Sequence, residues 1–207
     1  MRWRRQVEIP ASARAALALE PGERVLAVAT ASADAGGTGD IGGGALDPGG
    51  GAVHPGGGAV DPGGGTRDSG GGAVPHVIAT DRALHVPAAG GGLARIGYES
   101  IAKVSWDGDP ATLTVVLPEP DGRLDLRLAE PGYLPETVRE RVQSTIVYSQ
   151  HVPLDGRRGV LVSARRAPGT GQTRWVVVFD AGLDRTDPGL RERAERVVAE
   201  LRAQTGI

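Results

Sequence analysis

The sequence predicts an α+β protein built from short antiparallel strands and a few helices. Short β-type runs, separated by Gly, Pro and Asp turn signals, fill most of the chain between residues 74 and 128. Two amphipathic helical patterns follow, one opening at Pro135 and one at Asp187. Roughly 170 residues lie outside a Gly-rich segment, which is enough chain for one domain with its own core.

The first expected elements precede the Gly-rich segment. Pro10 and the alanines after it predict a short helix over 10–19, which Pro21 and Gly22 end. The run 24–30 is typical of a strand.

The central strands are recognised by composition and alternation. Leu124, Leu126 and Leu128 alternate with Asp125 and Arg127, so one face of that strand is expected to be buried and the other wet. The expected strands here are 74–80, 82–87, 93–97, 101–106, 112–117 and 123–128.

The last third of the chain mixes helices with β-type runs. Leu134, Val138 and Val142 recur at a four-residue step and predict a helix over 135–144. Residues 145–149 return to β character, and a further hairpin is expected from 159–166 and 173–179. Asp187 is a good N-cap and Pro188 suits the first helical position of the final helix. Its apolar stripe is expected to contact the core and consists of Leu190, Ala194, Val197, Val198 and Leu201.

Residues 42–76 contain a heptapeptide repeat. The copies are GGGALDP, GGGAVHP, GGGAVDP, GGGTRDS and GGGAVPH. Three glycines in every seven residues exclude a stable helix, and the period does not match collagen or the calcium-binding β-roll. We therefore expect residues 36–72 to form a disordered insertion in a surface loop.

Composition excludes several classes of protein. The 23 basic and 25 acidic residues nearly balance, unlike those of a strongly basic nucleic-acid-binding protein. The chain has no cysteine, so disulfides and thiolate metal sites are excluded. Glu8 and Arg14 interrupt any signal-peptide core, and no run of about 18 apolar residues suggests a membrane span. A cytoplasmic location is expected.

Two motifs resemble bacterial pleckstrin-homology-like (PH/GRAM-like) domains. Thr80-Asp-Arg-Ala-Leu-His-Val86 matches the pattern T-[DN]-x-x-L-x-V, and Ile96-Gly-Tyr-Glu-Ser-Ile-Ala-Lys-Val104 matches I-x-[YW]-x-x-I-x-x-V. The resemblance covers about residues 24–128. The whole chain is also similar to an uncharacterised protein family of high-GC actinobacteria.

The resemblance implies a PH-like half-open antiparallel β-barrel with C-terminal helices and an additional β-hairpin, used for binding and assembly. A single PH-like globular domain is expected over 24–35 and 73–207, after an N-terminal segment over 1–23. Either the 135–144 helix or the final helix could close the barrel. Lipid-binding relatives place phosphoinositide contacts between the first two strands, but Arg67 is the only basic residue there, so no specific phosphoinositide is expected.

Most candidate chemical sites have simpler structural explanations. The G-x-G-x-x-G match at 37–42 lacks the following helix that would hold a pyrophosphate. His85 should alternate outward from Leu84 and Val86, and no two histidines stand at metal-ligand spacing. Asp180, Asp184 and Asp187 could bind a metal, but a loop with an N-cap explains them. We expect no catalytic residue, metal or cofactor.

The hairpin carries the candidate binding surface, which consists of Arg157, Arg158, Arg165, Arg174 and Trp175. Neighbouring strand residues face opposite sides, so only part of this group should share a patch. Such a patch could hold an anion, a nucleic-acid backbone or an acidic protein. Trp3, among N-terminal arginines, could contact a membrane interface.

The leading functional hypothesis is a non-enzymatic cytoplasmic scaffolding module that binds an unidentified protein partner or forms a homo-oligomer. The alternative is a peripheral binder of nucleic acid or acidic membrane through the Arg157–Arg174 hairpin. An enzyme ranks third, because no constellation of residues supports one.

Overall fold

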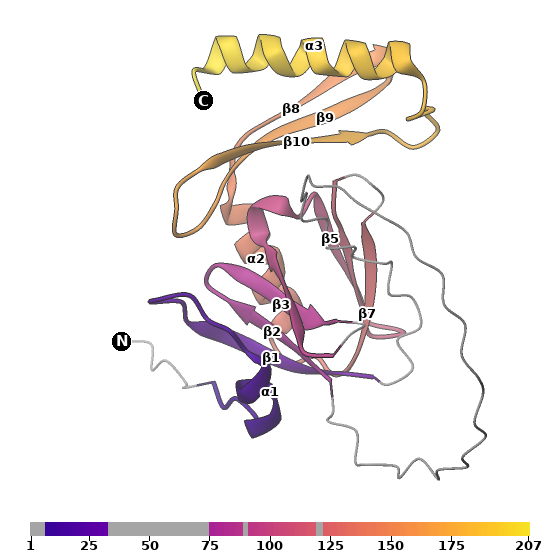
Figure 1. Ribbon diagram of the computed structural model, residues 1–207. Helices are drawn as coiled ribbons and strands as arrows, with labels where there is room; N and C mark the ends of the chain where they lie inside the picture. Colours follow the sequence, from indigo (N-terminus) through magenta and orange to yellow (C-terminus); the bar gives the residue numbers. More distant parts are fainter. Residues whose placement is uncertain (1–6, 33–74, 89–90, 119–121) are drawn as a thin grey trace, which may run out of the picture.

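The computed structural model describes residues 7–32, 75–88, 91–118 and 122–207 (Figure 1). The Gly-rich insertion predicted at 36–72 lies outside the described residues. So do Trp3, His54 and the G-x-G-x-x-G stretch at 37–42.

Seven strands form one antiparallel sheet in the order β4-β3-β2-β1-β7-β6-β5. Two consecutive meanders are thus joined through the pairing of β1 with β7. The strands are β1 (Val25–Ala31), β2 (His76–Thr80), β3 (Ala83–Pro87), β4 (Leu93–Gly97), β5 (Lys103–Asp107), β6 (Thr112–Val116) and β7 (Arg123–Glu130), with the 3₁₀ turn η1 (Tyr98–Ser100) between β4 and β5. All six strands expected between 74 and 128 are present within two residues of their predicted ends.

The helix α2 (Leu134–Ser144) packs against this sheet. Leu134, Val138 and Val142 are buried in the same apolar cluster as Leu84, Leu113 and other strand side chains. The four-residue step of these side chains gives α2 one apolar stripe, as its sequence predicts. Because the cluster contains no residue of the final helix, α2 is the helix that covers the seven-stranded sheet.

A second antiparallel sheet of three strands lies beside the first, in the order β10-β9-β8 (Figure 1). It consists of β8 (Ile146–Asp155), β9 (Arg158–Arg166) and β10 (Thr173–Phe179). The predicted hairpin matches β9 and β10 closely. The β-type run at 145–149 is the start of β8, a ten-residue strand that pairs along β9 and turns the expected hairpin into a sheet.

The final helix α3 (Pro188–Thr205) covers one face of this second sheet. Asp187 caps it by accepting a hydrogen bond from the Gly189 N–H at 2.9 Å. Ala194 and Leu201 of α3 bury against Val160 and Val162 of β9, in a second apolar cluster.

The fold class predicted from the sequence, α+β with mostly antiparallel strands and few helices, is confirmed. The N-terminal helix α1 (Ala11–Ala16) is shorter than the 10–19 expected, because Leu17 adopts an extended backbone. No helix within the described ranges is long and apolar enough to cross a membrane.

Candidate functional site

The structure separates the arginines of the candidate binding surface, only part of which was expected to share a patch. Arg157 and Arg158 lie at the turn between β8 and β9, whereas Arg174 lies near the start of β10, opposite Arg165. Seven residues of strand separate the levels of Arg158 and Arg165, about 23 Å at about 3.3 Å per residue. These arginines therefore do not form one patch.

Arg165 is not a surface residue at all. It is 3% exposed and lies on the β9 face that meets the first sheet. Its Nη1 donates to the Val142 carbonyl at 3.2 Å and to Thr145 Oγ1 at 3.1 Å, and its Nη2 donates to the Ala102 carbonyl at 3.0 Å. Burial lowers the pKa of its guanidinium. The expectation that Arg165 is exposed on the hairpin surface is wrong, because the first sheet and α2 cover it.

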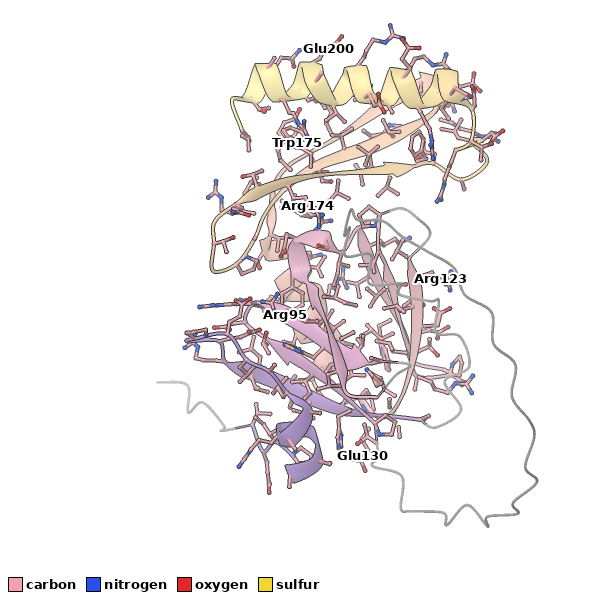
Figure 2. The ribbon with its side chains drawn as sticks, viewed as in Figure 1. Arg95, Arg123, Glu130, Arg174, Trp175 and Glu200 are labelled. Carbon is pink, nitrogen blue, oxygen red and sulfur yellow. The ribbon has the colours of Figure 1, made fainter. Side chains whose placement is uncertain are left out.

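Arg174 and Trp175 lie on opposite faces of β10 (Figure 2). Arg174 donates to Ser100 Oγ of η1 at 2.7 Å, toward the first sheet. Trp175 lies under α3, tilted against Tyr148 with ring centroids 6.1 Å apart, and the Arg202 guanidinium lies 5.8 Å from its ring centroid. The alternation of side chains along a strand separates these two residues.

The hollow that Arg165 helps to line is the groove between β5 and α2. Its volume is about 560 Å³. Val104 and Trp106 of β5 line one wall, and Pro135 and Arg139 of α2 line the other. β5 is an edge strand of the seven-stranded sheet, so half of its backbone N–H and C=O groups point away from β6.

The groove combines apolar surface with positive charge. Trp106 is 37% exposed, although it is a large aromatic side chain. Three cationic side chains, Lys103, Arg139 and Arg165, line the groove together with one carboxylate, Glu136. Arg165 has no salt bridge among the described residues, so its charge is offset mainly by the carbonyls of Val142, near the end of α2, and of Ala102, just before β5. The local field therefore favours an anionic ligand group.

His85 is buried, contrary to its predicted outward orientation. It is 2% exposed, and its Nε2 lies 3.6 Å from Glu23 Oε1, a side chain that is also buried. Arg95 and Glu20 approach from the same side. The segment before β1 covers this face of β3, which a local alternation pattern cannot predict.

A polar cluster that the sequence did not reveal lies around Thr80. Thr80 Oγ1 accepts from the backbone N–H groups of Arg82 and Ala83 and contacts Glu23, and Tyr98 Oη donates to the Thr80 carbonyl at 3.0 Å. Tyr98 is fully buried. The only signal in the sequence was the pair of motifs that contain Thr80 and Tyr98. The cluster is closed to solvent and stabilises the β2–β3 turn.

The remaining acidic and histidine candidates have local partners. Asp180 accepts from Gly159 N–H and pairs with His151 at 2.8 Å, and Asp184 accepts from Thr186. Ser12 Oγ lies 3.3 Å from Nε2 of His76. In the described part of the chain, no three His, Asp or Glu side chains group as metal ligands would.

Comparisons with protein-family models, with curated proteins and with solved structures gave no match.

Proposed function

We propose that this chain is a non-enzymatic binding module that holds an extended, acidic segment of a partner protein in the groove between β5 and α2. One observation carries the proposal. An edge strand borders a groove that exposes Trp106 and places two exposed cationic side chains, Lys103 and Arg139, beside one carboxylate.

The backbone of β5 supports this mode of binding. An added strand would pair with the outward N–H and C=O groups of β5, and alternate side chains of that strand would enter the groove. Trp106 offers a large apolar contact there. Lys103 and Arg139 would attract acidic side chains and exclude basic ones.

We also propose that the seven-stranded sheet with α2 is a PH-like barrel. The two motifs that carry the resemblance span β2 to β5. Their Thr80 and Tyr98 are joined by a hydrogen bond, and a helix follows the last strand. These features support a scaffold for binding. A nucleic-acid or membrane role through the hairpin arginines is not favoured, because Arg157 and Arg158 lie at the opposite end of β9 from Arg174 and because Arg165 is buried.

The test is a selection of peptides from a displayed random library on the immobilised full chain, followed by titration of the selected peptides. We expect peptides rich in Asp and Glu. Arg139→Glu and Trp106→Ser should each weaken binding roughly tenfold or more, which corresponds to about 1.4 kcal/mol. Amide signals of β5 should shift on binding.

The matched control is Arg127→Glu, an exposed arginine of β7 that makes the same charge change away from the groove. It should leave the affinity unchanged. Selected peptides that bind equally well to the Arg139→Glu and Trp106→Ser variants would contradict the proposal, and so would a selection that yields no binding peptide.

A further inference from the structure

The outer edge of β10 exposes backbone groups. Among the described strands, β10 pairs with β9 alone. Hydrogen bonds at the two ends of this pair, from Ala167 N to Gln172 O and from Asp180 N to Gly159 O, define which residues bond across it. Along an antiparallel strand, residues whose backbone groups bond to the neighbouring strand alternate with residues whose backbone groups point away from it. The N–H and C=O groups of Trp175, Val177 and Phe179 therefore point away from β9.

Beyond Arg174, this edge lacks the features that protect the sheet edges formed by β4 and β8. Arg95 lies within β4, and β8 contains Pro153 and two register shifts. β10 has no register shift against β9, and its residues Trp175–Phe179 are all apolar. A regular, apolar edge strand is a template for pairing with another strand.

A second groove runs beside this edge, between β10 and α3. Its volume is about 510 Å³. Trp175, Val177 and Phe179 line it from β10, and small or apolar residues such as Ala194 and Val198 line it from α3. The groove continues the apolar layer between the second sheet and α3 up to the edge of the molecule.

We propose that β10 pairs in an antiparallel manner with β10 of a second copy of this chain, about a twofold axis at Val177. The two three-stranded sheets then form one six-stranded sheet, and the two α3 helices lie side by side on the same face of it. The outward backbone groups of Trp175, Val177 and Phe179 all find partners in this register.

The sequence of β10 is complementary to itself in this register. Trp175 lies opposite Phe179 of the second copy, and the cationic Arg174 lies opposite the anionic Asp180. Aromatic pairs and opposite charges across a strand pair are both favourable.

Two charged side chains on α3 would also pair with each other across the proposed twofold axis. Glu195 and Arg202 both line the groove and lie seven residues, or about two turns, apart on one face of α3. In two antiparallel α3 helices, Glu195 of each copy then lies near Arg202 of the other. This self-complementarity, present in both β10 and α3, identifies a second copy of the chain as the occupant.

The first test uses single cysteines, since the chain has none of its own. In the proposed register the two Val177 Cα atoms lie about 5.5 Å apart, within the span of a disulfide. V177C should therefore form a disulfide-linked dimer on mild oxidation. F179C is the matched control on the same strand and face, because its two copies would lie about 13 Å apart along the strands.

The second test measures the mass of the full chain by light scattering over a hundredfold range of concentration. We expect a dimer for the parent chain and a monomer for V177P. The Val177 N–H points away from β9, so proline removes no bond within the sheet. Circular dichroism and melting should show that V177P is folded.

Two results would overturn the proposal. One is a parent chain that stays monomeric at every concentration while V177C crosslinks no faster than F179C, which would leave a foreign strand as the occupant of this edge. The other is a dimer that V177P leaves intact.

Discussion

Arg165 on β9 donates a hydrogen bond of 3.0 Å to the main-chain carbonyl of Ala102, sixty-three residues earlier in the chain. The same guanidinium reaches the carbonyl of Val142 near the end of α2. One side chain of the second sheet therefore holds both walls of the β5–α2 groove. Cations near a helix C-terminus are favoured, which offsets part of the cost of burying the charge.

Replacing Arg165 by methionine should destabilise the protein by about 2–4 kcal/mol. Methionine fills much of the space but leaves two carbonyls and the Thr145 hydroxyl without their buried partner. Lysine should rescue the loss only in part, because it lacks the planar fork of donors. Urea unfolding of the full chain measures the free energy.

The matched control is Arg166→Met, at the exposed neighbouring position of β9. It should change the free energy of unfolding by no more than about 0.5 kcal/mol. Equal stability of Arg165→Met and the parent would show that the guanidinium does not join the two sheets.

Tyr98→Phe should cost about 1–2 kcal/mol, because the buried Thr80 carbonyl loses the hydroxyl that donates to it. Burial also raises the pKa of Tyr98 far above its ordinary value of 10.0. The unfolded chain loses this proton above about pH 10 and the folded chain keeps it, so stability should fall as the pH rises further.

Absorbance at the phenolate band tests both statements. Tyr133→Phe, which removes a hydroxyl from a side chain that is 81% exposed, is the matched control. The parent should show one phenolate that appears only when the protein unfolds, and Tyr98→Phe should lack it. A full set of phenolates in the folded parent would contradict the burial of Tyr98.

Mild acid should destabilise the protein through His85. Burial lowers the pKa of this imidazole below its ordinary value of 6.5, although the nearby carboxylate of Glu23 opposes the shift. Below about pH 6.5 the unfolded chain therefore binds a proton that the folded chain does not, and stability falls as the pH falls. His85→Gln should flatten the dependence of the melting temperature on pH between 6.5 and 5.

Protonation of Glu23 should also lower the stability of the folded protein, but at a lower pH than protonation of His85. Burial raises its pKa, but hydrogen bonds from Thr80 and the Glu20 N–H outweigh this, so the pKa lies below its ordinary value of 4.5. Its contribution should be lost only below about pH 4.5, which separates it from His85.

Local signals were sufficient to predict most of the elements. Asp187 and Pro188 mark the start of α3, and the step from Leu134 to Val142 marks α2, because capping and helical periodicity act within a few residues. The hairpin of β9 and β10 was also predicted, because the apolar pattern of a strand is a local signal. The full length of β8 was not, since its second half depends on pairing with β9 and carries Pro153.

The sequence by itself determined the α+β class, the order of the strands along the chain and the two amphipathic helices, because periodicity, turns and caps are local. Only the tertiary structure decided that Arg165 and His85 are buried, that Arg174 and Trp175 face different layers, and that β5 and α2 enclose a groove. Burial depends on which distant segment covers a side chain, and no pattern within a single strand contains that information.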